Sequence, residues 1–140
     1  VEMREHNKAI KDLAKAIALD PKDAMAYHYR GCAYGVKGEL NQAIKYHSKA
    51  LKLDPQYARA YRDRGFAYRD KGEDDRAIKD YSKAIELDPQ DVVAYAARGL
   101  IYGRRFEYTK AIKDLSRAIE LSPKSNLPYC LRGLAYYITA

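Results

Sequence analysis

The sequence predicts an all-α fold in which pairs of helices stack into a solenoid, and three observations support this fold class. Residues of the same kind recur every 34 positions along the 140-residue chain. Within each period, the apolar and small residues are spaced as on one face of a helix. Each period also ends at a proline, which cannot continue a helix.

The 34-residue period is carried by six sets of residues, and self-similarity at such a period is typical of repeat proteins. The sets are Pro21, Pro55, Pro89 and Pro123; Gly31, Gly65, Gly99 and Gly133; Tyr27, Tyr61, Tyr95 and Tyr129; Tyr34, Tyr68, Tyr102 and Tyr136; Ala9, Ala43, Ala77 and Ala111; and Ala16, Ala50, Ala84 and Ala118. A chain of this length suits one domain.

The first half of each period predicts one helix, which in the first complete period runs from Ala24 to Lys37. Tyr27, Gly31 and Tyr34 fall four and three residues apart and therefore share its inward face. The small Gly31 allows the partner helix to approach closely. Gly38 is expected to cap the end of this helix.

The second half of the period predicts a second helix, with Asn41 as its N-cap and its end at Asp54-Pro55. Its residues at helical spacing are Ala43, Ile44, His47, Ala50 and Leu51. The third period lacks the cap glycine and has Arg104-Arg105-Phe106-Glu107-Tyr108 in its place. Phe106 and Tyr108 are expected either to pack on each other or to protrude.

This pattern resembles the tetratricopeptide repeat (TPR) family over the whole chain. The resemblance is carried, in the second period, by Tyr61, Gly65, Tyr68, Ala77, Tyr81, Ala84 and Pro89. It implies a right-handed superhelix of antiparallel helix pairs, whose first helices line a concave groove that binds a peptide or partner protein. The single domain 1–140 then divides into a half repeat 1–23, repeats 24–57, 58–91 and 92–125, and a half repeat 126–140.

The groove positions differ from repeat to repeat, which makes the groove the candidate partner site. A net charge of +7 and a pI of about 9.3 favour a partner with acidic character. In this interpretation the arginines attract acidic side chains, and the apolar residues supply contact area. The expected groove residues are Arg59, Arg62, Phe66, Arg69, Tyr29, His28, Leu100 and Arg104.

Two other functions stay open. Arginines beside aromatic residues also suit RNA or another polyanion, and such binding falls steeply with salt. The chain also suits a docking arm of a larger enzyme.

Chaperone-binding members of the family hold a C-terminal carboxylate in a clamp of lysine, asparagine and arginine. In one frame the matching positions are His28, Cys32, Asp63, Val93 and Ala97, and in the next they are Arg62, Phe66, Ala97, Leu127 and Leu131. Neither set fits the clamp, so a chaperone-tail site is not expected.

Catalytic chemistry finds little support, so the chain is predicted not to be an enzyme and to need no cofactor or metal. It has no glycine-rich phosphate loop, zinc-type cysteine pair or nucleophile elbow. His28 and Cys32 share one helix face, where they could hold part of a metal site or a reactive thiol. Because structural metal sites usually have four ligands, we interpret them as neighbouring groove residues.

Charged residues that recur at the period are interpreted as architecture. The arginines are expected to cover apolar surface with their stems and to reach Asp54, Asp80, Asp88 or Asp114. The lysines are expected to form a solvated stripe on the convex side. The two sets are Arg30, Arg64, Arg98 and Arg132, and Lys11, Lys45, Lys79 and Lys113.

The two ends of the chain are complementary halves of one repeat, which predicts self-association. Head-to-tail docking onto another copy is expected, with a two-fold end-to-end dimer as the competing arrangement and a truncated longer chain as the alternative. The expected contact joins Leu131, Leu134, Tyr137 and Ile138 to Ile10, Leu13 and Ile17.

The chain contains no run of about 18 apolar residues, so membrane insertion is not expected. It contains two cysteines and shows no leader peptide. The expected location is therefore the cytoplasm.

Overall fold

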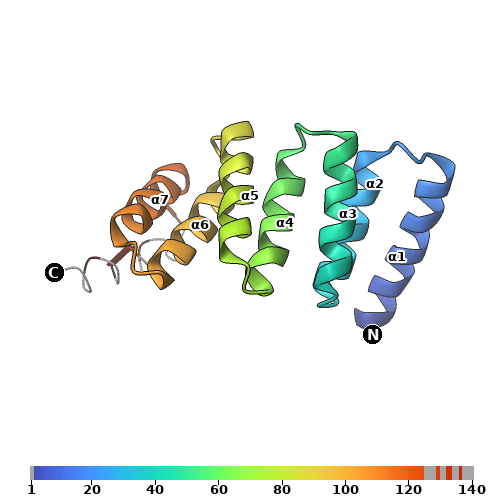
Figure 1. The fold of residues 1–140 in the computed structure, drawn as a ribbon, viewed down its shortest axis with the longest axis horizontal. Helices are drawn as coiled ribbons and strands as arrows, with labels where there is room; N and C mark the ends of the chain where they lie inside the picture. Colours follow the sequence, from blue (N-terminus) through green and yellow to red (C-terminus); the bar gives the residue numbers. More distant parts are fainter. Residues whose placement is uncertain (1, 125–128, 130–131, 134–135, 137–140) are drawn as a thin grey trace. The chain divides into compact units, whose positions relative to one another are not determined.

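The structure, a computed structural model, describes residues 2–124, 129, 132–133 and 136. Residues 2–124 form seven helices and no strand, as the sequence predicts (Figure 1). The helices are α1 (Glu2–Leu19), α2 (Ala24–Val36), α3 (Leu40–Leu53), α4 (Ala58–Asp70), α5 (Asp74–Leu87), α6 (Val92–Arg104) and α7 (Tyr108–Leu121).

The chain divides into two compact units, residues 1–80 and 81–140, with the boundary inside α5. In the first unit α1 packs on α2, α2 on α3, and α3 on α4 (Figure 1). In the second unit α6 packs on α7. The α2–α3 and α6–α7 pairs are the two halves of the predicted repeats 24–57 and 92–125, and the α1–α2 and α3–α4 contacts join neighbouring repeats, so the all-α repeat fold is confirmed. The single domain with its repeat boundaries stays a prediction.

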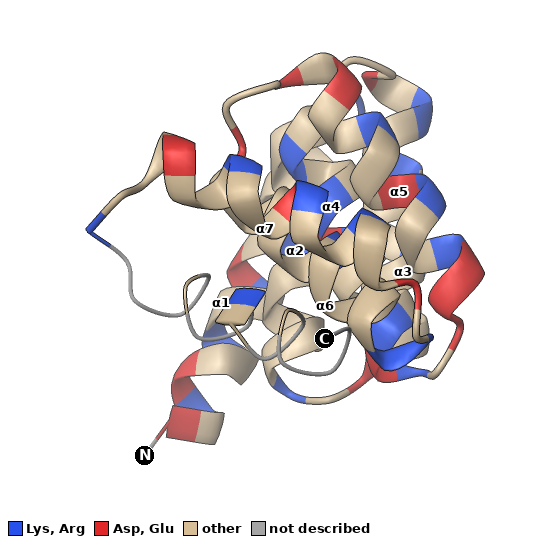
Figure 2. Ribbon diagram, turned by 90° about the vertical axis from the view of Figure 1, so that its left-hand side faces the viewer, with Lys and Arg blue, Asp and Glu red and all other residues tan. Residues whose placement is uncertain are grey.

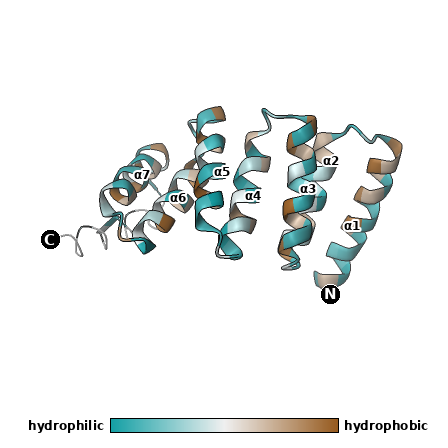
Figure 3. Cartoon of the chain, in the orientation of Figure 1, coloured by the Kyte–Doolittle hydropathy of each residue, from teal (hydrophilic) through white to brown (hydrophobic). Residues whose placement is uncertain are grey.

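The recurring alanines are buried where the helices pack. Ala43 and Ala50 of α3 and Ala60 of α4 are fully buried, and Tyr27, Tyr57 and Tyr61 are packed around the cluster to which Ala50 and Ala60 belong. Small side chains let helix axes approach, and the tyrosine rings then fill the remaining space. The other sides of the second helices are polar, as the hydrophilic residues along α5 show (Figure 3).

Glycines at positive φ end the first helices of two repeats. Gly38 and Gly72 have φ of 77° and 80°, a region that other residues rarely adopt. Phe106 stands at the equivalent place of the third repeat and has a φ of 62°. Its ring lies 6.2 Å from that of Tyr108, edge to face, and the residue is 78% exposed. Phe106 therefore both packs on Tyr108 and protrudes.

The helix starts differ from the sequence expectation. Asn41 is not an N-cap, because α3 begins at Leu40 after Glu39, whose side chain makes no capping bond. Side-chain caps occur instead at α2 and α6, where carboxylates accept hydrogen bonds from backbone N–H groups. The capping residues are Asp23 and Asp91.

Two of the recurring arginines form bidentate ion pairs, as expected of an architectural role. Arg64 Nε and Nη2 donate to Asp80 at 2.7 and 2.8 Å, and Arg98 makes the same two bonds to Asp114 at 2.7 and 2.8 Å. Both aspartates are buried. Of the four aspartates expected as partners, only these two bind the recurring arginines within residues 2–124.

Serine completes each arginine contact from the other side. Arg64 donates to Ser48 Oγ at 3.1 Å, and Arg98 donates to Ser82 Oγ at 2.9 Å. In the first repeat the aspartate is replaced by Tyr46, and the guanidinium of Arg30 lies 4.5 Å from the centre of that ring.

Candidate functional site

A cleft of about 300 Å³ lies in the first unit where α2, α3 and α4 meet. It is on the side that the sequence predicts to face the groove. Apolar side chains and two carboxylates border it together. The lining residues are Cys32, Gly35, Val36, Leu40, Ala43, His47, Asp63, Phe66, Ala67 and Asp70.

Exposed large apolar side chains gather on α2 and α6. On α2 they are Met25, Tyr29 and Val36, and on α6 they are Val93 and Leu100. Helices α3, α5 and α7, which are described over their full lengths, expose none. Two of the first helices, α2 and α6, therefore expose large apolar side chains, whereas α4 exposes none and α1 exposes Met3 and Leu19 near its two ends.

Two of the predicted groove arginines, Arg62 and Arg69, form ion pairs with the aspartate that follows them in the sequence. Arg62 Nε lies 3.3 Å from Asp63 Oδ1. Arg69 donates to Asp70 Oδ1 at 3.1 and 3.0 Å, and its guanidinium lies 5.0 Å from the centre of the Phe66 ring. Arg59 is exposed and forms no ion pair with any described residue. In the second unit, Arg104 is also exposed.

His28 is not on the groove surface, which corrects its predicted role as an open groove residue. It is 3% exposed. Its Nε2 lies 2.8 Å from Asp63 Oδ2, and its Nδ1 lies 2.8 Å from the Tyr57 hydroxyl. Cys32 Sγ lies 3.5 Å from His28 Nε2 and 3.6 Å from Asp63 Oδ2. The predicted groove thus contains a polar cluster between α2 and α4.

His47 of α3 extends this cluster, although the sequence assigned it only an inward position. Its side chain is 2% exposed, and its Nδ1 has no hydrogen-bond partner. Its ring centre lies 5.3 Å from that of His28. One ring nitrogen of each histidine and the sulfur of Cys32 all lie within 4.8 Å of one another. The sequence signal that could have indicated a polar cluster here is a histidine at an inward position between Ala43 and Ala50.

Burial controls the protonation of the cluster. Burial and the charge of Asp63 raise the pKa of Cys32 to about 12, and burial together with His28 lowers the pKa of His47 to about 4. Burial raises the pKa of Asp63, but the hydrogen bond from His28 and the charge of Arg62 outweigh it, so this pKa lies below its usual value. At neutral pH the thiol is protonated, and a protonated thiol is a poor nucleophile.

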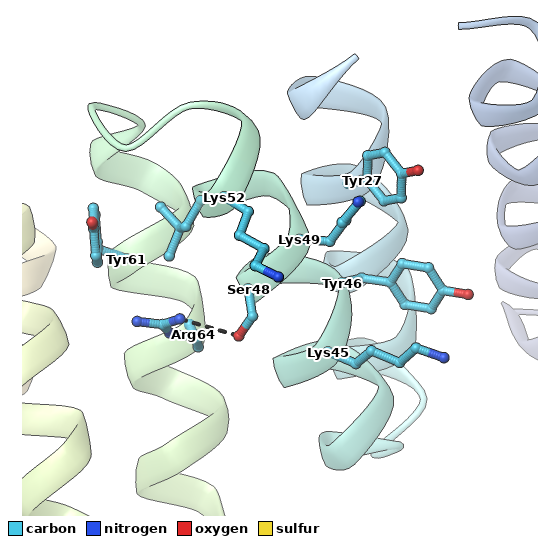
Figure 4. Close-up of a pocket in the computed structure, with 9 residues that line it drawn as sticks. Tyr27, Lys45, Tyr46, Ser48, Lys49, Lys52, Tyr61 and Arg64 are labelled. Carbon is cyan, nitrogen blue, oxygen red and sulfur yellow. Dashed lines mark hydrogen bonds between the residues drawn. The ribbon is translucent and has the colours of Figure 1, made fainter. Parts of the chain in front are cut away.

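A second cleft, of about 700 Å³, lies between α3 and α4 beside α2 (Figure 4). Lys49 reaches toward Tyr27, with Nζ 5.8 Å from the centre of the ring, and Arg64 is held by Ser48. The sequence assigned Lys45 to a solvated stripe and did not predict this cleft, because its walls come from three helices. The lining residues are Tyr27, Lys45, Tyr46, Ser48, Lys49, Leu51, Lys52, Tyr61 and Arg64.

Basic and acidic residues are interspersed on the described helices (Figure 2). Most of the ion pairs on the helix surfaces join residues close in the sequence. Examples are Lys83–Glu86 at 2.9 Å and Lys110–Glu107 at 2.7 Å. On the described helices, many basic side chains are therefore paired with an acidic side chain nearby in the sequence.

The predicted self-association residues are only partly described. Ile10, Leu13 and Ile17 are half-buried on α1, a helix that has no fully buried residue. Leu131, Leu134, Tyr137 and Ile138 lie outside the described residues. Among the helices that the structure describes, none has the length and apolar character needed to cross a membrane.

Sequence profiles of the tetratricopeptide repeat match residues 1–23 and 24–57, and a profile described as TPR repeat matches 65–105 and 107–138. Among curated proteins, none matches the sequence. Two crystal structures of MamA are 30% and 31% identical to this chain, with TM-scores of 0.89 and 0.87. They cover 96% and 95% of this chain, and the chain covers 78% and 73% of theirs.

A third structure is the first TPR of Spaghetti (RPAP3), bound to the HSP90 peptide SRMEEVD. It is 24% identical with a TM-score of 0.80, covering 86% of this chain and 97% of its own. At this identity the similarity shows the fold alone.

Proposed function

The chain belongs to the tetratricopeptide repeat family, and on this basis we propose that its first helices bind an extended peptide segment with acidic and apolar side chains. The fold supports a protein–protein interaction scaffold, and proteins of this family are in general non-catalytic interaction modules. What we propose is the chemistry of the peptide and the surface of the domain that binds it.

The observation that carries the proposal is the position of the exposed apolar side chains. In the first unit, Met25, Tyr29 and Val36 are exposed on α2, and the cleft beside them reaches Phe66 on α4. Large apolar side chains grouped on one face of a soluble domain mark interaction sites. Aromatic side chains such as Tyr29 supply much of the energy in such contacts.

The arginines of α4 define the charge and the length of the partner. Arg59 and Arg69 are ten residues apart, which is about 15 Å along a helix. A fully extended peptide covers this distance with about four or five residues. We therefore expect acidic side chains at that separation, with apolar residues between them.

A free C-terminal carboxylate is not required in this proposal. The Spaghetti domain, which shares this fold, was solved with the acidic peptide SRMEEVD. In the present chain the matching clamp positions include buried His28 and the ionised Asp63, which would repel a carboxylate. Amidation of the peptide C-terminus should therefore leave its affinity unchanged.

Selection from a displayed random-peptide library tests the proposal with the variant Arg59→Glu/Arg69→Glu. Peptides selected on the wild type should carry the predicted acidic spacing and bind the variant at least about tenfold more weakly, because opposite charges become like charges. Arg62 is left unchanged because it contacts Asp63. The matched control is Lys11→Glu/Lys79→Glu, which makes the same charge change on second helices and should retain affinity.

Equal affinity of the wild type and the arginine variant for the selected peptides would contradict the proposal. The same wild type and variants also test the alternative function, which is polyanion binding. It predicts that RNA affinity falls steeply with salt and that Arg59→Glu/Arg69→Glu, which reverses charges in the basic groove, loses it more than Lys11→Glu/Lys79→Glu does.

Self-association through α1 is a second part of the proposed function. The half-buried Ile10, Leu13 and Ile17 leave α1 with apolar surface that another copy would cover. We expect the apparent mass of the wild type, measured by light scattering, to rise with concentration, and that of Ile10→Asp/Ile17→Asp to stay at one chain. A constant monomer mass for the wild type would contradict this prediction.

A further inference from the structure

Three potential metal ligands, whose ligand atoms lie within 4.8 Å of one another, gather beside the 300 Å³ cleft, and the carboxylate of Asp63 contacts two of them. His28 and Cys32 lie one turn apart on α2, His47 comes from α3, and Asp63 comes from α4. Three of these four residues, Cys32, His47 and Asp63, line the cleft, which provides a path from solvent. The sequence showed only the His28–Cys32 pair, and the expectation of no metal depended on there being two ligands.

The spacing of three of these ligands is close to that of a tetrahedral zinc site. Ligand atoms about 2.0–2.3 Å from tetrahedral zinc lie about 3.3–3.7 Å from one another. Cys32 Sγ lies 3.5 Å from His28 Nε2 and 3.6 Å from Asp63 Oδ2. The third separation, from His28 Nε2 to Asp63 Oδ2, is 2.8 Å and holds a hydrogen bond. It would widen by about half an ångström when a cation replaces the shared proton.

His47 provides the second, independent observation. Its Nδ1 is buried without a hydrogen-bond partner, an arrangement that is unfavourable in a folded protein. The edge of the ring that holds both nitrogens faces Gly31, because a Cβ built there would be 2.8 Å from Cε1 and Nδ1 and 3.0 Å from Nε2. Gly31 lies between His28 and Cys32 on α2, and one nitrogen of His47 lies within 4.8 Å of the ligand atoms of both residues.

We propose that His28, Cys32, His47 and Asp63 form a structural zinc site that joins α2, α3 and α4. Two imidazoles, one thiolate and one carboxylate are a donor set that suits Zn²⁺ in tetrahedral geometry. Binding is a ligand exchange without a redox step. The Cys32 thiol releases its proton to solvent, water leaves the metal, and the His28 proton moves from Nε2 to Nδ1.

Tyr57 acts as the positioning residue of this site. Its hydroxyl oxygen lies 2.8 Å from His28 Nδ1 and can accept a hydrogen bond from the N–H that metal binding places there. Metal-bound histidines usually donate their second N–H in this way, and loss of such a partner weakens metal binding about 10–100-fold. Tyr57→Phe should therefore weaken zinc affinity within that range while the helices remain intact.

Titration of the full chain with CoCl₂ under reducing conditions tests the proposal. We expect saturation at one cobalt per chain, with the visible bands of tetrahedral cobalt and a near-ultraviolet thiolate-to-cobalt band, all removed by ZnCl₂. Cys32→Ser should lose the thiolate band, and the matched Cys130→Ser should keep it. His47→Leu should lose the tetrahedral spectrum, and the matched His6→Leu should keep it.

A second measurement decides the question if a ligand variant fails to fold. In Cys130→Ser, Cys32 is the single thiol, and saturating ZnCl₂ should slow its alkylation at least tenfold. The alternative is a metal-free hydrogen-bond network. A folded chain that gives no saturable cobalt spectrum, no zinc protection of Cys32, or an unchanged spectrum in folded Cys32→Ser would overturn the proposal.

Discussion

Replacement of Arg98 by methionine is expected to lower the free energy of unfolding by about 3–5 kcal/mol, because it leaves a buried carboxylate without its counter-charge. Arg98 makes two bonds to Asp114, at 2.7 and 2.8 Å, and one to Ser82 at 2.9 Å. Asp114 is 3% exposed. Methionine retains most of the apolar part of the arginine side chain, so the packing is largely preserved. The decrease in the free energy of unfolding then measures the loss of the ion pair. Guanidinium unfolding followed by circular dichroism measures it.

The matched control for this prediction is Arg117→Met on α7. Arg117 pairs with Glu120 at 2.9 Å, but both side chains are largely solvated, and such pairs contribute little. The double variant Arg98→Met/Asp114→Leu removes both charges and should recover most of the lost stability. If Arg98→Met unfolds at the same denaturant concentration as Arg117→Met, the architectural role is refuted. Arg64→Met should behave like Arg98→Met, because Arg64 and Asp80 repeat the geometry.

Replacement of Gly31 by alanine is expected to destabilise the first unit by up to about 2 kcal/mol. The new Cβ would lie 2.8 Å from two ring atoms of His47, which is fully buried. Overpacking of this kind costs about 1–3 kcal/mol, and the higher helix propensity of alanine offsets about 1 kcal/mol of it. The measurement is guanidinium unfolding in the presence of a chelator, so that bound metal does not contribute.

Gly35→Ala is the matched control on the same helix. A Cβ at Gly35 would meet the Ala43 methyl at 3.8 Å, an ordinary contact. This variant should therefore gain about 0.5–1 kcal/mol from helix propensity alone. Gly31→Ala and Gly35→Ala should shift the unfolding midpoint in opposite directions. Equal stabilisation by both would show that His47 does not constrain the approach of α2 and α3.

The architecture was predictable because it repeats. Residues that recur every 34 positions placed Tyr27, Gly31 and Tyr34 on one face, and the expected end of the first helix differs from the observed one by a single residue. The same periodicity separated architectural arginines from groove residues. A further signal of the period was not used in the prediction. Serines recur every 34 residues, and each contacts the arginine 16 residues further on. They are Ser48, Ser82 and Ser116.

The site was less predictable because it depends on contacts between helices. Helical spacing showed that His28 and Cys32 share a face, but it placed both on an open groove. The structure buries His28 beneath Tyr57 and Asp63, which are 29 and 35 residues further along the chain. No periodicity relates these residues, because the aromatic and carboxylate partners are particular to this pair of repeats.

The sequence by itself determined the all-α repeat fold, the helix pairs and their order, because each follows from spacing along one chain. The tertiary structure alone decided which aspartates bind the repeated arginines, that His28 is buried, and that a ring nitrogen of His47 lies within 4.8 Å of the Cys32 sulfur. These are distances between side chains on different helices. They depend on how far apart the packed helices lie and how they are shifted along their axes, and small residues such as Gly31 set that approach.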